Sequence, residues 1–177
     1  MSVKTLTKTM TVNVFYVILI CLLCSYIGIS SAASVKSFEQ EVLDAHNFYR
    51  ARHNAPPLEL NDDLSDLATD WAKYLLATKR MEHRENSGYG ENIYMAVGGD
   101  LDGSDAVKSW YDEIEDYNWR RPSFQMNTGH FTQVVWKGSK ELGVGFAKCG
   151  NTIYVVCNYD PPGNYINMFQ KNVSPAN

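Results

Sequence analysis

Two apolar runs separated by a glycine-asparagine pair constrain the fold of this chain more than any other feature. Residues 142–146 alternate between apolar residues and glycine, residues 152–156 are almost wholly apolar, and Gly150-Asn151 lies between the two runs. Runs of this length around a two-residue turn predict a pair of antiparallel strands. Amphipathic segments precede the pair, so we expect an α+β fold with helices packed on a small antiparallel sheet.

Three stretches before the strand pair place apolar residues at helical spacing. The first is predicted to run from Ser37, which begins a capping box, to about Arg52. The second begins at Asn61 with aspartates in its first turn, and its apolar stripe is that of a central core helix. The third takes Ser104 as its cap. Residues 81–103 are glycine-rich and without a clear period, so we expect an irregular loop there.

A short apolar helix is predicted at Gly129–Trp136, with Asn127 or Thr128 as its cap. His130 stands at the start of this helix, directly behind a glycine. A single histidine on a short helix is more often a hydrogen-bonded structural residue than a ligand. Partners from other parts of the chain are therefore needed before His130 counts as part of a site.

The first 33 residues differ from the rest of the chain in composition. Lys4 and Lys8 precede an apolar run over residues 14–29, and small residues follow it. This order is typical of a secretory signal, so we expect a signal peptide over residues 1–33 and one domain over residues 34–177. An uncleaved membrane anchor is the alternative, but the run is short for a bilayer span. Cleavage predicts a secreted, extracellular protein without stable membrane insertion.

The charge balance restricts the partners of the mature domain. Removal of the signal segment changes the formal net charge from −4 to −6, because that segment holds two lysines and no acidic residue. The apolar fraction of 45% and the charged fraction of 20% are those of an ordinary globular protein. An acidic domain argues against nucleic acid and against anionic membrane surfaces as partners.

The cysteines follow the same division of the chain. Cys21 and Cys24 lie inside the apolar run and are interpreted as packing residues of the signal segment. In the domain, a turn at Gly150-Asn151 would leave Cys149 beside the turn and Cys157 too far away for a disulfide. A looser loop would permit the bond in an oxidising compartment. The pattern favours free thiols.

Two histidines and two glutamates from separate segments form the candidate site. They are His83, Glu91, Glu113 and His130. Imidazoles with carboxylates suit a divalent metal such as zinc, or general acid and base catalysis near neutral pH. The chain has no close-spaced ligand motif such as H-E-x-x-H, so spacing alone does not show that these residues converge.

Four segments of the domain resemble the signatures of a known superfamily. They are His46-Asn-Phe-Tyr-Arg50, Gly90-Glu-Asn-Ile93, Gly129-His-Phe-Thr-Gln-Val-Val-Trp136 and Val156-Cys-Asn-Tyr-Asp-Pro-Pro-Gly-Asn164. Their order and spread resemble the CAP superfamily, which joins cysteine-rich secretory proteins, insect venom allergens and plant pathogenesis-related proteins. The low cysteine count is similar to the Golgi-associated plant pathogenesis-related branch. Members of that branch are usually myristoylated, whereas this chain begins Met-Ser and cannot carry the lipid.

The resemblance implies a three-layer α-β-α sandwich with a large open cleft. It further implies that His83, Glu91, Glu113 and His130 are the tetrad of that cleft, with the two histidines as the metal-binding pair. His46 lies in a signature that is mainly structural in the superfamily. His53 precedes a proline turn, so we expect its ring in solvent.

The segment before His130 contains three spaced aromatic residues, Tyr117, Trp119 and Phe124. Their spacing resembles the caveolin-type motif that sterol-binding superfamily members carry in a mobile loop. Packing of a linker onto the core explains the same spacing equally well. Some superfamily members hold a fatty acid in a groove between two amphipathic helices, a feature that the sequence does not reveal.

Three functions are consistent with these features. A secreted protein that binds a sterol or other small lipid ranks first, and an extracellular interaction protein of immunity or reproduction, with a protein partner, ranks second. A metal-assisted hydrolase ranks third, because no serine or cysteine of the chain has the setting of an activated nucleophile. A divalent cation such as Zn²⁺ would be an optional cofactor of the cleft.

Overall fold

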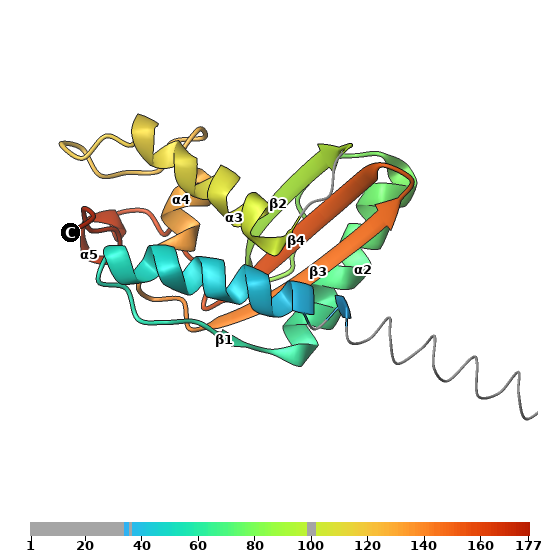
Figure 1. Ribbon diagram of the computed structural model, residues 1–177. Helices are drawn as coiled ribbons and strands as arrows, with labels where there is room; N and C mark the ends of the chain where they lie inside the picture. Colours follow the sequence, from blue (N-terminus) through green and yellow to red (C-terminus); the bar gives the residue numbers. More distant parts are fainter. Residues whose placement is uncertain (1–33, 36, 99–101) are drawn as a thin grey trace, which may run out of the picture. The chain divides into compact units, whose positions relative to one another are not determined.

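The described residues form a four-stranded sheet in the order β1-β3-β4-β2 (Figure 1). The strands are β1 (Glu59–Leu60), β2 (Gly90–Val97), β3 (Glu141–Cys149) and β4 (Thr152–Asp160). Strand β3 runs antiparallel to β4, β4 antiparallel to β2, and the short β1 parallel to β3. This computed structural model describes residues 34–35, 37–98 and 102–177, so the predicted signal peptide, with Cys21 and Cys24, lies outside the described residues.

The predicted strand pair is confirmed, with Gly150-Asn151 as its two-residue turn. Gly150 has a φ of 57°, a conformation that a residue without Cβ adopts at little cost. Cys157 lies opposite Val144 in β3, and both Cys149 and Cys157 are free thiols, as predicted. Burial raises the pKa of the Cys157 thiol, which is therefore an unreactive core residue.

The prediction of an irregular loop over residues 81–103 is wrong for its second half. Strand β2 pairs with β4 along its whole length, from Gly90 opposite Tyr159 to Val97 opposite Thr152. Strand β2 lies at the edge of the sheet, and Val97 at its end is 70% exposed. An apolar residue at an exposed position weakens the alternation of polar and apolar residues that would mark a strand in the sequence. Pairing with a strand about 60 residues away in sequence is what makes this segment regular.

Helices cover both faces of the sheet, which confirms the α+β sandwich (Figure 1). On one face lies α2 (Asp62–Thr78), which packs against β3 and β4. Helix α2 is therefore the second of the predicted helices, the one expected to be central to the core. On the other face lie a helix over residues 37–52, α3 (Gly103–Asp112) and α4 (Gly129–Val134). A 3-10 turn, η1 (Glu113–Asp116), follows α3, and a short α5 (Phe169–Asn172) lies near the C-terminus.

Glycines in β3 set how closely α2 approaches the sheet. A Cβ at Gly143 would lie 2.2 Å from the carbonyl carbon of Leu64, and a Cβ at Gly145 would lie 2.1 Å from the backbone nitrogen of Thr69. Both neighbours are backbone atoms of α2, which cannot move aside independently. The helix therefore rests directly on the strand backbone at these positions.

The residue that caps the helix is the predicted one in α2 and a different one in α3. The side chain of Asn61 accepts a hydrogen bond from the Leu64 N–H and caps α2, as predicted. In α3 the cap is Asp102 rather than Ser104, because the carboxylate of Asp102 accepts from both the Ser104 and Asp105 N–H groups. Asp102 lies two positions before Ser104, and its carboxylate satisfies two backbone N–H groups of the first turn at once.

A buried arginine joins the elements on the second face. The Arg50 guanidinium is fully buried and donates to the carbonyl oxygens of Pro56, Val134, Trp136 and Ser139 at 2.8–3.0 Å. Burial lowers the pKa of Arg50 to about 10, which still leaves it charged at neutral pH. Within the part of the chain that the structure describes, no helix has both the length and the apolar character needed to span a bilayer.

Candidate functional site

Glu113 binds both the ring and the backbone of the segment that carries His130. Its Oε1 lies 2.6 Å from His130 Nδ1, and its Oε2 accepts from the N–H groups of His130 and Phe131 at 3.0 and 3.1 Å. The carboxylate therefore caps α4 from a different element. Thr128 occupies the cap position without a side-chain capping bond, so the prediction of Asn127 or Thr128 as capping side chain is wrong.

A second histidine–carboxylate pair joins the loop after α2 to strand β2. His83 Nδ1 lies 2.7 Å from Glu91 Oε1, which also accepts from the Arg84 N–H at 3.1 Å. The Glu91 side chain is 6% exposed, whereas that of His83 is 67% exposed. The hydrogen bond to Glu91 raises the pKa of His83, because it stabilises the imidazolium form.

The other carboxylate oxygen of Glu91 is buried and receives no hydrogen bond from any residue that the structure describes. Asn158 lies directly opposite Glu91 across β2 and β4, and its Oδ1 is equally buried without a donor. The Asn158 amide nitrogen donates to Gly90 O at 3.3 Å. Two neighbouring acceptors without donors mark a place where a water, a proton or a ligand donor would be stabilised.

The two histidine pairs are attached to opposite faces of β2. Successive residues of a strand point to opposite sides, so Glu91 and Asn92 diverge. Asn92 donates to His130 O at 3.2 Å on the face covered by α3 and α4, where Tyr159 also lies. Glu91 shares its face with Ile93, which packs on α2. Each histidine of the predicted tetrad therefore contacts one of its glutamates, and Asn92 hydrogen-bonds the His130 segment to β2. The convergence of all four residues stays a prediction.

The two histidine–carboxylate pairs offer nitrogen and oxygen donors of the kind that a divalent metal binds. Both rings use Nδ1 toward a carboxylate, which is the arrangement that orients a metal-binding histidine and leaves its Nε2 for the metal. In the described ranges, however, no three His, Cys, Asp or Glu side chains are grouped closely enough to hold an ion. A metal at His83 or His130 would need water or ligand atoms for its remaining positions. The metal-binding pair stays a prediction.

His46 has the structural setting that its signature implies. Its ring is fully buried, with Nδ1 2.8 Å from Val42 O and Nε2 2.8 Å from the Tyr159 hydroxyl. Asn92 donates to the same hydroxyl at 3.1 Å, so Tyr159 donates to His46 and accepts from Asn92. Burial lowers the pKa of His46 to about 3, so the ring is neutral at physiological pH.

The prediction that His53 lies in solvent is wrong. Its ring is fully buried, with Nδ1 2.6 Å from Ser174 O and Nε2 2.9 Å from the Tyr111 hydroxyl. Burial lowers its pKa. The C-terminal segment, 121 residues away in sequence, supplies the cover that local sequence does not indicate.

The aromatic segment after η1 divides into buried and exposed residues. Tyr117 is 5% exposed, and its ring packs edge-on against Trp119 at 4.7 Å and against Phe131 at 5.5 Å. Trp119 also packs edge-on against Phe131. Phe124 is 52% exposed. Of the three predicted lipid-loop residues, Tyr117 is buried, whereas Trp119 is 37% exposed and rests one edge on Phe131. The Phe124 ring is exposed but lies against Gly129, where a Cβ would come within 3.0 Å of it.

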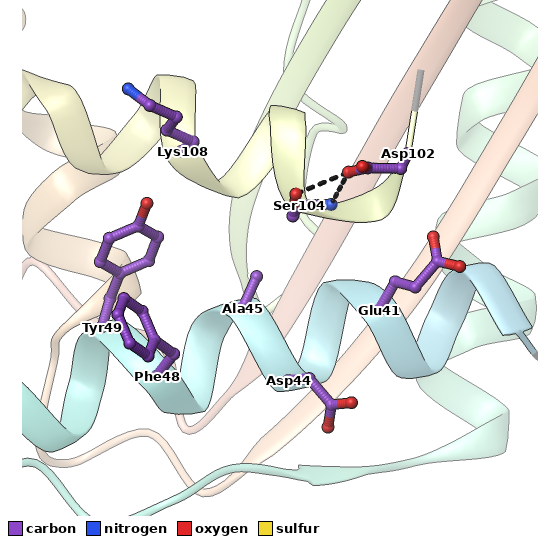
Figure 2. Close-up of a pocket in the computed structure, with 8 residues that line it drawn as sticks. All are labelled: Glu41, Asp44, Ala45, Phe48, Tyr49, Asp102, Ser104 and Lys108. Carbon is purple, nitrogen blue, oxygen red and sulfur yellow. Dashed lines mark hydrogen bonds between the residues drawn. The ribbon is translucent and has the colours of Figure 1, made fainter. Parts of the chain in front are cut away.

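A groove of about 600 Å³ lies between the helix over residues 37–52 and α3 (Figure 2). At one end Gly103 brings the helices together, since a Cβ there would lie 2.8 Å from Val42 N. At the other end the rings of Tyr49 and Tyr111 stack with centroids 3.9 Å apart. Between these contacts the groove is lined by Glu41, Asp44, Ala45, Phe48, Tyr49, Asp102, Ser104 and Lys108.

Sequence reasoning missed this groove and also missed Asn92, Asn158 and Tyr159. One signal was available for the groove: Phe48 falls on the polar side of an otherwise well-segregated helix, and it is 63% exposed. The three others lie inside the quoted signature segments, but their contacts could not be read from the sequence, because they depend on strand register and on distant segments.

Comparison with known proteins agrees with these motifs and this arrangement of layers. The family described as "CAP: Cysteine-rich secretory protein family" matches residues 43–159 of the chain. The chain belongs to the CAP family. Among solved CAP-fold structures, the crystal structure of NaASP2 with Zn²⁺ has a TM-score of 0.63 and 24% identity, covering 80% of this chain and 86% of NaASP2. That likeness supports the shared fold.

Relatives in the CAP family differ in their cellular location. Golgi-associated plant pathogenesis-related protein 1 of Homo sapiens is 40% identical over 146 residues, covering 79% of this chain and 94% of the human protein. Secreted protein PRY1 of Candida albicans is 38% identical over 154 residues, covering 85% of this chain and 36% of the Candida protein. By their names, one of these relatives is associated with the Golgi and the other is secreted, so membership of the family does not by itself fix a cellular location.

Proposed function

We propose that this CAP protein is a secreted, non-catalytic binding protein that holds a small amphiphilic lipid in the groove between the helix over residues 37–52 and α3. The observation that carries the proposal is the hollow of about 600 Å³ between two helices, with an exposed phenylalanine on its wall. Ligand pockets of proteins have volumes of this order and combine apolar walls with a few polar groups.

The groove exists because small side chains lie between two close contacts. Ala45 and Ser104 project from the facing helices between the contact at Gly103 and the stacked pair of Tyr49 and Tyr111 (Figure 2). Residues at both ends belong to or contact the buried core, which holds the two helices at a fixed spacing. A rigid hollow loses little entropy when a ligand enters it.

The aromatic loop supports sterol binding less well than the groove supports an amphiphile. Tyr117 is buried, and the exposed Trp119 packs edge-on against Phe131, so moving both rings to contact a sterol would uncover Phe131. Phe124 and Met126, which is 91% exposed, remain as apolar contacts on this loop. They suit a shallow surface contact better than an enclosed sterol site.

Lipid binding is tested with decyl maltoside, a neutral amphiphile, used below its micelle concentration in isothermal titration calorimetry. Saturable binding that is lost in Ala45→Phe, which fills the groove, supports the proposal. The matched control is Ala77→Phe, because Ala77 is an exposed alanine on α2. Equal heats in wild type and Ala45→Phe would rule out the groove. Radiolabelled cholesterol with Phe124→Ser tests the loop separately.

A divalent metal site at His83 and His130 is a second candidate, favoured by the paired Nδ1–carboxylate contacts. Such a metal would serve as a Lewis acid or a bridge to a ligand. Here Glu91 and Glu113 would hold the two rings in position, and His83 and His130 would provide Nε2. Zinc titrations of wild type, His83→Ala and His130→Ala decide the matter, because equal heats for all three would exclude both rings as ligands.

A further inference from the structure

We infer that the groove selects amphiphiles with a cationic head, such as a long-chain amine or quaternary ammonium compound, over fatty acids. The inference rests on the proposed function and names its ligand class. Its basis is the charge of the lining, in which three carboxylates, on Glu41, Asp44 and Asp102, accompany a single ammonium on Lys108.

The one cation of the lining is already paired. Lys108 Nζ lies 2.5 Å from Asp112 Oδ2, one helical turn further along α3. Its charge is therefore compensated by a carboxylate outside the lining, and the field inside the groove comes mainly from the acids. A fatty acid entering the groove would bring its carboxylate into this negative field.

Two of the carboxylates accept hydrogen bonds from uncharged groups. Asp102 accepts from the N–H and hydroxyl groups of Ser104 (Figure 2). Asp44 accepts from the Gln40 amide at 2.8 Å. These donors are neutral, so they orient the carboxylates without cancelling their charge. The hydrogen bond from Ser104 also lowers the pKa of Asp102, which is ionised at neutral pH.

The aromatic wall favours the same class of ligand. The rings of Phe48 and Tyr49 are arranged edge to face with centroids 5.3 Å apart, and Phe48 is 63% exposed. Faces of aromatic rings attract ammonium groups and also cover alkyl chains. The Arg52 guanidinium lies 5.8 Å from the centroid of the Tyr111 ring, which stacks on Tyr49, so the favoured entry directs the cationic head toward the acids and the alkyl chain toward the rings.

The test compares three amphiphiles with the same chain and different heads: decyltrimethylammonium, decyl maltoside and decanoate, each below its micelle concentration. We expect the ammonium compound to bind at least about tenfold more tightly than decanoate, with an advantage that shrinks as salt is added. Tighter or equal binding of decanoate would overturn the inference and leave the proposed function standing. Absence of binding by all three would overturn both.

Variants locate the effect in the groove. Glu41→Gln/Asp44→Asn is expected to lower the ratio of ammonium affinity to decyl maltoside affinity by about tenfold, because it removes charge without filling space. The ratio is the readout because Glu41 also accepts from the Gly103 N–H, so the variant can change the binding of both compounds. The matched control is Asp66→Asn/Asp70→Asn, which removes two exposed carboxylates from α2 on the far face of the sheet. Equal loss of ammonium binding in both double variants, or no loss in either, would overturn selection by the groove. Circular dichroism confirms that each variant is folded.

Discussion

Glu91 and Asn158 face each other across β2 and β4, and each carries a buried side-chain oxygen that receives no hydrogen bond from the described residues. Directly opposed residues on antiparallel strands have Cβ atoms about 5 Å apart, close enough for their side chains to interact. A negative charge that is buried beside a second acceptor makes this position sensitive to any further negative charge.

Replacement of Asn158 by aspartate tests that sensitivity. Asn158→Asp would place two carboxylates opposite each other, so we expect the free energy of unfolding at neutral pH to fall by about 2–4 kcal/mol. Urea denaturation provides the measurement, and Asn151→Asp in the exposed turn is the control, with an expected change below about 0.5 kcal/mol. Equal effects of the two variants would contradict the buried-charge argument.

The Glu91 contact determines the titration of His83. Because the hydrogen bond raises the pKa of His83 above its ordinary value of 6.5, Glu91→Gln should return that pKa toward 6.5 in an NMR titration. The sign for stability follows, since a pKa raised by folding contributes stability that is complete below about pH 6.5 and is lost as pH rises through the folded pKa. Wild type should therefore lose more stability than Glu91→Gln between mildly acidic and alkaline pH. An unchanged His83 titration in Glu91→Gln would show that the contact is absent in solution.

The buried ring of His46 predicts the opposite dependence on pH. Its pKa of about 3 lies below the ordinary value of 6.5, so on acidification the unfolded chain takes up a proton that the folded protein does not. Between neutral pH and about pH 4.5 this difference costs about 2–3 kcal/mol. His46→Gln should be less stable at neutral pH but should lose about that much less on acidification, as measured by urea denaturation. The same acid sensitivity in both proteins would assign it to other groups.

The close approach of α2 to β3 predicts a strong effect of one added methyl group. In Gly145→Ala the new Cβ would lie 2.1 Å from the Thr69 backbone nitrogen, so the helix must move away, at a cost of about 3 kcal/mol. Gly150→Ala is the control, because its site has a φ of 57° with no atom within 4 Å, and only the backbone cost of about 1–2 kcal/mol applies. Thermal unfolding of both variants gives the comparison. A smaller loss for Gly145→Ala than for Gly150→Ala would mean that the two layers are loosely packed.

Features encoded by neighbouring residues were predicted well. The turn at Gly150-Asn151 and the cap at Asn61 each depend on a few adjacent positions, and both are present. The cap of α4 depends on Glu113, which lies 16 residues before Gly129, where the helix begins, and local reasoning assigned it to the wrong side chain. Strand β2 was missed for the same reason, since only its pairing with β4 makes it regular.

The candidate site likewise combines features that the sequence motifs indicate with features that depend on distant segments. Each histidine contacts a glutamate, but these contacts, the burial of His53 and the lack of a donor to Glu91 Oε2 all depend on segments that meet only in the folded chain. Strand register decides which face each residue of β2 occupies, and therefore separates Glu91 from Asn92.

By itself, the sequence determined the family, the succession of helices and the paired strands, because hydrophobic period, caps and turn residues act over a few positions along the chain. The tertiary structure alone decided where the groove opens and which charges line it. These properties depend on the distance between two helices about 60 residues apart, which a glycine contact at one end and an aromatic stack at the other set together.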